Sequence, residues 1–360
     1  MKKIVHIINA DRFTSGYINY MEIVMKEFNH FFICLKSRYQ LKLFDYTKLY
    51  EIKSYKEIVF SKQIISMLES AEKIIISGIF NIEKNLFFLP SEILSKTSLH
   101  FWGGDFYQFE NPTTIKKSIQ KKIMYSVIKR CDSVIFLIDG EYQKFESIFN
   151  INKKYYIAAM PYNPIDQVDY SNVKNKIKQH PHRILVGNSA TESNHHMNIF
   201  ELVKKYREIY SDFEVVCPLS YGSESYRKYI LQEGTKLLGK SFIPILNAMN
   251  LDEYVDLLAT CSVAVFNNDR QQAMGNINQL LYLGRKVYIR QDTSMWDSYN
   301  NRGFVVNSIE KLVRNNGNFL FDINYNEMKK NEITTRKYFE HRTETFIKQW
   351  EEVLNSQLKR

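Results

Sequence analysis

The chain lacks any apolar run long enough to cross a membrane. None of its apolar stretches reaches the roughly 18 to 20 residues that a spanning helix needs. The lysine-bearing start, Met1–Ile8, is too short and lacks the cleavage site of a signal peptide, so we expect it to be the first strand of a domain. Repeats of 20 to 50 residues and low-complexity tracts are absent as well.

Cysteine is scarce, and metal-ligand spacing is absent. Cys34, Cys131, Cys217 and Cys261 are scattered, each in or beside an apolar stretch. This pattern argues against a zinc site, a disulfide framework and a catalytic thiol. We expect four reduced core thiols in a cytoplasmic protein.

What the chain does have is length, positive charge and aromatic surface. Its 360 residues are long for one core and suit two α/β domains. The 24 Phe and 24 Tyr residues supply surface for packing or for stacking on a ligand. The net charge of +10 favours anionic partners: nucleic acid, nucleotide phosphates or an acidic membrane face. Charge alone does not choose among these.

Short apolar runs alternate with stretches of helical length in both halves of the chain. This rhythm is typical of α/β domains, in which helices cover both faces of a parallel sheet. We expect a Rossmann-like domain at 1–163, a lysine-rich linker at 164–181, a second Rossmann-like domain at 182–335 and a C-terminal helix at 336–360. Two such domains facing across a cleft make the B-type glycosyltransferase (GT-B) architecture, which several epimerases and phosphorylases share. Strands are expected at 4–8, 31–35, 74–76, 99–102, 134–138, 184–186, 214–217, 263–266 and 286–289, and later helices at 196–210, 223–234, 251–260, 275–284 and 338–358.

A strand, a polar loop and a helix start follow one another at 184–198. Gly187, Asn188 and Ser189 end the apolar run, and Ser193 or Asn194 is available to cap the helix. Thr191 and Ser193 are further polar side chains of this loop. Backbone amides and the helix dipole favour a phosphate at such a position. The alternative is an ordinary turn, because any βα turn carries polar residues and a capped helix.

Two further loops of the second half carry candidate ligand-binding groups. In the segment 267–276, Arg270 can neutralise a diphosphate through its planar fork, two glutamines follow it, and Gly275 permits close backbone approach. Tyr221 lies in a glycine-bearing loop after the strand at 214–217, where it could lie against a nucleobase or ribose. An ordinary surface loop remains the alternative for both.

The first half offers carboxylates after two strands. Asp105 follows two glycines and is flanked by a tryptophan and a tyrosine on which a sugar could stack. A general base that deprotonates an acceptor hydroxyl needs such a carboxylate, although capping a turn is the alternative role. Asp11 is an equally placed competitor. The acceptor-side candidates are Asp11, Trp102, Gly103, Gly104 and Tyr107, with Asp105 as the candidate base.

A basic helix is expected at 116–130. It carries six basic and no acidic residues, with Ile119, Ile123, Val127 and Ile128 on one face. Such a helix can lie on anionic lipid headgroups, or it can be the solvated cover of a sheet.

Three segments together resemble a known family. They are Phe101–Tyr107 (FWGGDFY), Ile184–Ser189 (ILVGNS) with Ser193, Asn194 and His196, and Arg270-Gln271-Gln272 with Gly275. In this order and spacing they resemble the bacterial TDP-N-acetylfucosamine:lipid II N-acetylfucosaminyltransferase family, glycosyltransferase family 56. The likeness runs from about 99 to 289. The family's Trp-Gly-Ala-Asp is Trp-Gly-Gly-Asp here, and a family glycine after the glutamines is Ala273.

The resemblance implies a GT-B fold and the transfer of an amino-deoxy sugar from a dTDP donor to a polyprenyl-diphosphate-linked saccharide. The setting it implies is enterobacterial common antigen or O-antigen synthesis, with the enzyme peripheral on the cytoplasmic face of the bacterial inner membrane. Carried over by position, Arg270 belongs to the donor site and Asp105 to the acceptor side, and these two are the candidate catalytic residues. Asp105 is the expected base if the reaction inverts, and it only positions the acceptor if the reaction retains configuration. The donor-binding candidates, including Tyr221 from the loop analysis, are Gly187, Asn188, Ser189, Asn194, His196, Tyr221, Gln271, Gln272 and Gly275.

Neither a cofactor nor a metal is expected. An Asp-x-Asp motif is missing from the donor loops, which favours a cationic side chain as the group that stabilises the leaving diphosphate. Two rival functions remain. A GT-B sugar-nucleotide 2-epimerase needs carboxylates and histidines around the donor sugar, and in this sequence His195 and His196 are the only such residues expected near the donor sugar. A nucleic-acid-binding protein is suggested by charge and aromatics alone.

Overall fold

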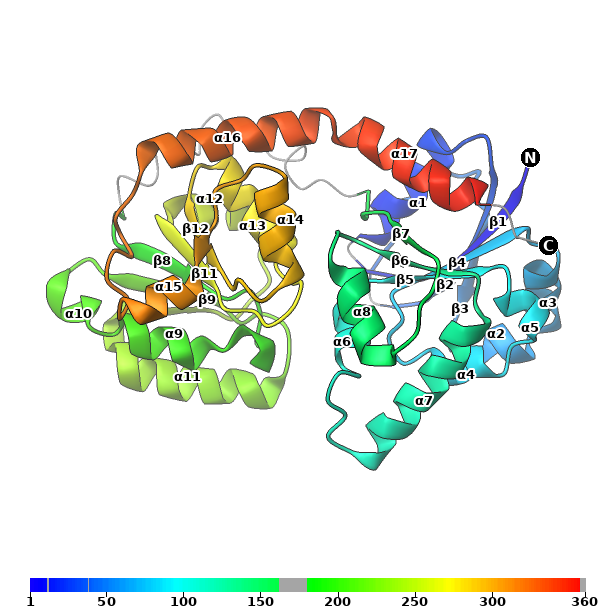
Figure 1. Cartoon of the computed structure of the whole chain (residues 1–360), viewed down its shortest axis with the longest axis horizontal. Helices are drawn as coiled ribbons and strands as arrows, with labels where there is room; N and C mark the ends of the chain where they lie inside the picture. The colour runs from blue at the N-terminus through cyan, green and yellow to red at the C-terminus, as the bar shows by residue number, and fades with distance from the viewer. Residues whose placement is uncertain (12, 38, 162–179, 357–360) are drawn as a thin grey trace. The chain divides into compact units, whose positions relative to one another are not determined.

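The computed structural model describes residues 1–11, 13–37, 39–161 and 180–356, and these divide into two compact units. Unit 1 is Met1–Tyr162 with Arg342–Arg360, and unit 2 is Asn163–His341. Each unit is a parallel sheet with helices packed against it, as the alternation of strand and helix patterns predicted (Figure 1). All but two residues of the predicted linker, 164–181, lie outside the described residues.

The sheet of unit 1 has, within the described residues, seven parallel strands in the order β3-β2-β1-β4-β5-β6-β7. The order reverses between β1 and β4, which makes their carboxyl ends the point where ligands bind in open sheets of this kind. Two strands, β3 and β7, were not predicted from the sequence because they are short and partly exposed. The strands are β1 (Lys3–Asn9), β2 (Asn29–Leu35), β3 (Leu49–Ile52), β4 (Lys73–Ser77), β5 (Thr97–Phe101), β6 (Ser133–Phe136) and β7 (Tyr155–Ile157).

The side chains of β1 alternate between the two faces of the sheet and pack into two separate apolar cores. Val5 and Ile7 pack with α3 to α8, whereas Ile4 and Ile8 pack with α1 and α17 on the other face. Alternation of this kind is the direct consequence of the two-residue period of a strand. The helices are α1 (Thr14–Val24), α2 (Glu57–Phe60), α3 (Lys62–Glu69), α4 (Glu83–Phe87), α5 (Ser91–Leu94), α6 (Gly104–Tyr107), α7 (Ile115–Arg130), α8 (Glu141–Phe149) and α17 (Arg342–Asn355).

The expected final helix at 338–358 is divided in two. One helix, α16 (Tyr325–Glu340), ends before His341 and belongs to unit 2, and α17 belongs to unit 1. Phe339, Phe346, Trp350 and Leu354 form an apolar stripe at helical spacing in the sequence, but Phe339 lies in α16 and only the other three are on the buried face of α17. There Trp350 is fully buried and its Nε1 donates to Ala159 O at 3.1 Å. The stripe therefore marks packing on unit 1 rather than a free helix.

The sheet of unit 2 has, in the part that the structure describes, six parallel strands in the order β10-β9-β8-β11-β12-β13. Here the order reverses between β8 and β11. The four predicted strands are confirmed, and the two edge strands were missed because β10 is short and partly exposed and β13 has two residues. The strands are β8 (Arg183–Val186), β9 (Glu214–Pro218), β10 (Phe242–Ile245), β11 (Val263–Phe266), β12 (Lys286–Ile289) and β13 (Asn307–Ser308).

Several helices of unit 2 bury apolar side chains in its core, among them Ile199 and Phe200 of α9 and Ile230 of α11. The start of α12 is set by a capping box, in which Asn250 accepts from Glu253 N and the Glu253 side chain accepts from Asn250 N. The expected helix at 196–210 is interrupted and forms α9 and α10. The helices are α9 (His196–Val203), α10 (Tyr206–Ile209), α11 (Glu224–Leu238), α12 (Leu251–Thr260), α13 (Met274–Tyr282), α14 (Ser294–Asn301), α15 (Ile309–Arg314) and α16. No helix among the described residues combines the length and apolar content needed to cross a membrane.

Candidate functional site

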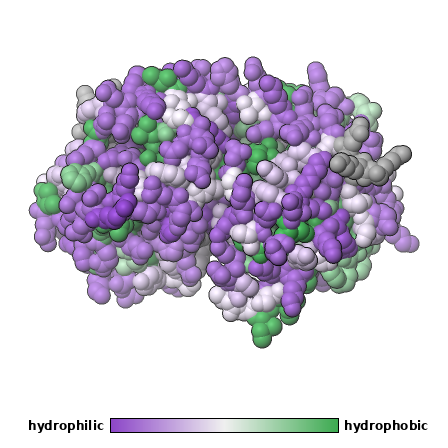
Figure 2. All heavy atoms as spheres, in the orientation of Figure 1, coloured by the Kyte–Doolittle hydropathy of each residue, from purple (hydrophilic) through white to green (hydrophobic). Residues whose placement is uncertain are grey.

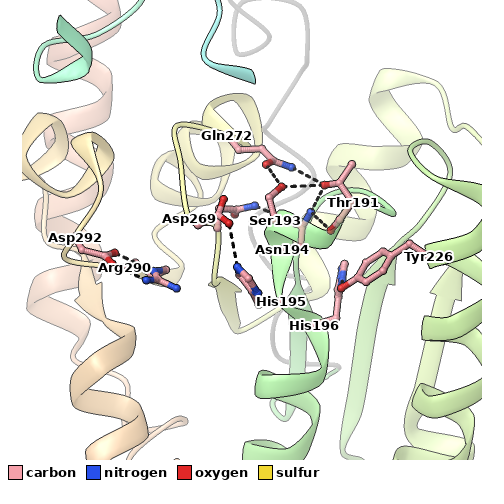
Figure 3. Close-up of polar contacts among 11 residues, drawn as sticks. Thr191, Ser193, Asn194, His195, His196, Tyr226, Asp269, Gln272, Arg290 and Asp292 are labelled. Carbon is pink, nitrogen blue, oxygen red and sulfur yellow. Dashed lines mark hydrogen bonds and ion pairs between the residues drawn. The ribbon is translucent and has the colours of Figure 1, made fainter. Parts of the chain in front are cut away.

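The polar segments singled out in the second half both follow strands at the reversal point of the unit 2 sheet. Residues 187–195 follow β8, and 267–273 follow β11, its neighbour in the sheet. Since the strands are parallel, both loops leave the same edge, so residues far apart in sequence meet there (Figure 3).

One glutamine bridges the two loops. Gln272 Nε2 donates to Asn188 Oδ1 at 2.9 Å, to Ser189 Oγ at 3.2 Å and to Thr191 Oγ1 at 3.3 Å. Its Oε1 accepts from Ser193 Oγ at 2.8 Å (Figure 3). Thr191 and Ser193 were noted as polar but not selected as site residues, because their importance depends on a partner 79 residues away or more.

Asn194 organises the first loop from within. Its Oδ1 accepts from Asn188 N at 3.0 Å and from Asn268 Nδ2 at 3.2 Å, and its Nδ2 donates to Thr191 Oγ1 at 2.7 Å. Asn194 and Asn268 are both fully buried. A buried amide that satisfies backbone and side-chain partners at once fixes a loop in one conformation. Asn194 therefore shapes the loop rather than capping α9 as expected; His195 occupies the cap position.

Gly187 permits a contact that no other residue would. Its φ is +70°, and a Cβ there would lie 2.5 Å from His196 Nε2 and 2.9 Å from Asn194 Oδ1. His196 is fully buried, with Nδ1 3.2 Å from Tyr226 Oη. Burial lowers the pKa of His196 to about 3, so the ring is neutral at physiological pH.

Charged side chains gather along the same edge. His195 Nε2 lies 3.1 Å from Asp269 Oδ2, and both are partly exposed. Arg270 follows, half-buried. Arg290, directly after β12, pairs with Asp292, and this hydrogen bond raises the pKa of Arg290 (Figure 3). Arg290 was missed, although an arginine directly after a predicted strand was a signal open to the sequence analysis.

The remaining donor candidates lie around this network. Tyr221, 46 % exposed, accepts from Asn188 Nδ2 at 2.7 Å, so the loop after β9 joins the other two. Gly275 is exposed in the first turn of α13, with open space around it. Gln271 is buried, and its backbone oxygen lies 3.5 Å from Arg270 Nη1.

Two helix starts at this edge have unusual backbone conformations. His195 precedes α9 with φ 45°, and Ala273 precedes α13 with φ 60°. Non-glycine residues in the left-handed region cost free energy and gather at functional sites. Both helices thus begin with strained residues beside the loops that Gln272 joins.

The carboxylates of unit 1 are engaged in their own loops. Asp105 is 0 % exposed, and its oxygens accept from Ile79 N and Trp102 N at 3.0 Å, which ties the loops after β4 and β5 together. Asp11 is half-buried, and its Oδ1 accepts from Thr14 N at 3.1 Å at the start of α1. Both therefore hold backbone amides.

The other acceptor candidates surround Asp105. Gly103, with φ 96°, precedes α6, which Gly104 begins. Trp102 is half-buried, and its Nε1 has no hydrogen-bond partner among the described residues. Tyr107 Oη donates to the buried Glu141 at 2.9 Å.

The whole chain matches one protein family. Residues 2–357 match the family described as 4-alpha-L-fucosyltransferase, glycosyl transferase group 56. The chain belongs to this family. The match extends the resemblance seen at 99–289 to both ends of the sequence, so this group 56 protein is a glycosyltransferase.

Solved structures share its fold at low sequence identity. A glycosyltransferase from Rickettsia africae is 12% identical with a TM-score of 0.67, and 99% of each chain is covered. Anabaena Alr3699/HepE in complex with UDP and glucose is 9% identical, with a TM-score of 0.67 over 98% of this chain and 99% of that one. S. aureus MnaA, in a structure with UDP, is 13% identical, with a TM-score of 0.55 over 99% of this chain and 97% of that one. These similarities show the two-domain GT-B fold.

Proposed function

We propose that this group 56 glycosyltransferase moves an amino-deoxy sugar resembling 4-acetamido-4,6-dideoxygalactose from a dTDP donor to a polyprenyl-diphosphate-linked saccharide. The pathway we propose is cell-surface polysaccharide assembly of the enterobacterial common antigen or O-antigen type. The observation that carries the donor assignment is the set of Gln272 hydrogen bonds that joins the loops after β8 and β11 at the reversal point of the sheet.

The leaving diphosphate is stabilised by cationic side chains in this proposal. Arg270 and Arg290 supply guanidinium groups, and the first turns of α9 and α13 supply backbone amides at the positive end of each helix dipole. Charge that develops on the departing phosphate oxygen is offset by groups already in place. We therefore retain metal-independent transfer as part of the proposal.

The donor's nucleoside is assigned to the neighbouring loop. Tyr221 presents an exposed ring beside Asn188, which suits a nucleobase or ribose. Neutral His196, packed against Gly187, holds the loop under the diphosphate rather than transferring protons.

Unit 1 binds the acceptor in this proposal. A general base must reach the acceptor hydroxyl. Both carboxylates accept from two backbone amides, but Asp11 is only half-buried after β1, whereas Asp105 is fully enclosed. We propose Asp11 as the base of an inverting reaction and Asp105 as the residue that positions Trp102, Gly103, Gly104 and Tyr107. The lipid-linked acceptor places the enzyme on the cytoplasmic face of the inner membrane, where its net charge of +10 favours anionic lipid.

Nucleotide preference and acceptor dependence test the proposal. Calorimetry with dTDP, UDP, GDP and CMP should show tightest binding of dTDP, and a dTDP-amino-deoxy sugar should be consumed only with a polyprenyl-diphosphate saccharide present. Tighter binding of UDP or GDP would mean that the donor sugar is carried by that nucleotide and not by dTDP. Rearrangement of the nucleotide sugar without an acceptor would indicate an epimerase instead.

A further inference from the structure

The helix α7 of unit 1 exposes apolar side chains at its first turns. Ile115 is 82 % exposed and Ile119 is 53 % exposed, while the face packed on the sheet consists of Met124, Val127 and Ile128. The sequence placed Ile119 on one face with Ile123, Val127 and Ile128, but Ile119 is exposed whereas Val127 and Ile128 are buried. Figure 2 shows hydrophobic surface at the lower tip of unit 1, where α7 begins.

Positive charge surrounds these two side chains. Lys116, Lys117, Lys121 and Lys122 lie within the first two turns, and Lys116 and Lys122 are exposed. Within the described parts of the chain, none of the four forms an ion pair. Their charge is thus directed at solvent around an apolar centre.

Acidic groups beside α7 are already engaged. Glu83 of α4 is buried and accepts from Gln120 Nε2 at 2.9 Å, and Glu110 pairs with Lys144. At its far end α7 is fixed by Arg130, whose guanidinium donates to Phe87 O and Leu89 O. The first turns therefore form a net positive surface with an apolar centre.

We propose that the first two turns of α7 dock on an anionic lipid bilayer, with Ile115 and Ile119 inserted at the headgroup boundary and the lysines on lipid phosphates. Nucleic acid would satisfy the lysines but leave the isoleucines in water, whereas a bilayer accommodates both. This deepens the membrane location in the proposed function by naming the surface, and it is separable from sugar transfer.

A fluorescent label tests the insertion directly. The four native cysteines are buried, and burial raises the pKa of each thiol, so a new surface cysteine can be labelled selectively. An environment-sensitive dye on Ile119→Cys should shift to shorter wavelength with vesicles of phosphatidylglycerol and phosphatidylcholine. Ile209→Cys, at a site 58 % exposed in unit 2, is the matched control and should not shift. Equal spectra with and without vesicles at both sites would overturn the proposal.

Vesicle sedimentation tests the energetics. Ile115→Asp combined with Ile119→Asp should weaken binding to anionic vesicles about tenfold or more, because apolar insertion is lost and two negative charges are added. Ile209→Asp should bind as the unmodified protein does. Lys116→Gln with Lys122→Gln should bind anionic vesicles more weakly and with a smaller salt dependence. Unchanged sedimentation of the isoleucine variant, or binding to oligonucleotide in preference to vesicles, would contradict the docking surface.

The two proposals fail in different ways. Transfer to a water-soluble acceptor analogue should persist in the isoleucine variant, which confirms that only docking was removed. Absence of transfer in the unmodified protein, with vesicle binding intact, would overturn the proposed function and leave the docking surface standing.

Discussion

The carboxyl-end loops of the two sheets use polar side chains in opposite ways. In unit 2, Gln272 joins loops after β8 and β11 through side-chain bonds, and Arg270 and Tyr221 beside it remain partly exposed. In unit 1, Asp105 is enclosed and its oxygens hold backbone amides after β4 and β5. The loops of unit 2 therefore keep polar groups at the surface, whereas in unit 1 the Asp105 carboxylate stabilises the loops themselves.

The difference suggests a division of labour. A donor diphosphate needs several fixed hydrogen-bond donors and cations, which unit 2 presents on loops held from below by Asn194 and His196. In the proposed function the acceptor side needs shape and one accessible base, a role that we propose for the half-buried Asp11.

Lowering the pH should produce the largest difference between the units, because it should destabilise unit 1 more than unit 2. Burial lowers the pKa of His6, His30 and His100 in unit 1, that of His100 to about 3, and in unit 2 it lowers that of His196. Because each of these pKa values is lower in the folded protein than in the unfolded chain, the unfolded chain binds more protons below pH 6.5. The free energy of unfolding therefore falls as pH drops, by up to about 1.4 kcal/mol per pH unit for each histidine.

Urea unfolding at pH 7 and pH 5 checks this expectation. Trp296→Phe leaves Trp102 and Trp350 as fluorescent reporters of unit 1 alone. The unit 1 transition should move to lower urea at pH 5, and His100→Gln should move less. A midpoint that does not change with pH would show that these histidines are not buried neutral.

Arg270→Ala should have the next largest effect, on catalysis. Removal of the guanidinium should cost about 2 to 4 kcal/mol of transition-state stabilisation, which is about 30-fold to 1000-fold in kcat/KM. Arg314→Ala, at an exposed arginine of α15, is the control and should keep full turnover. Steady-state kinetics measure both, and equal turnover would remove Arg270 from the donor site.

Asp105→Ala should act on stability. Two buried backbone amides lose their acceptor, so the free energy of unfolding should fall by about 3 kcal/mol. Asp139→Ala, at an exposed aspartate after β6, should change it by less than about 0.5 kcal/mol. If chemical denaturation gives the two variants equal stability, the hydrogen bonds of Asp105 to backbone amides do not stabilise the fold.

Gly187→Ala tests the packing beneath the donor loop. Gly187 and Gly303 both have positive φ, but a Cβ at Gly303 meets nothing within 4 Å. Alanine at Gly187 should therefore cost about 2 kcal/mol of unfolding free energy more than alanine at Gly303. Thermal unfolding of both variants measures the difference, and equal losses would mean that the contact with His196 is not tight.

The alternating pattern predicted most of the fold because buried parallel strands are continuous apolar runs. Ile74–Ile76 and Val263–Phe266 could be read directly, whereas β3, with the pattern LYEI, and the two-residue β13 carry no comparable signal. The division of the last helix at His341 was not predictable, because spacing along one helix does not reveal which unit it packs against.

The candidate site was predictable in its loops but not in its pairings. Gly187–Ser189 and Arg270–Gln272 stood out because each polar group follows an apolar strand. The order of the strands in each sheet decides which loops meet. It brings Gln272 to Thr191 and Ser193, and it brings Asp105 to the backbone amides of two loops. Strand order is a property of the sheet that local sequence does not encode.

Hydrogen exchange with and without dTDP tests the central claim, that the donor binds at the reversal point of the unit 2 sheet. Peptides covering 187–196 and 267–276 should gain protection on addition of dTDP, while 10–16 and 101–107 of unit 1 should not change. Protection confined to the unit 1 peptides, with 187–196 and 267–276 unaffected, would contradict the account.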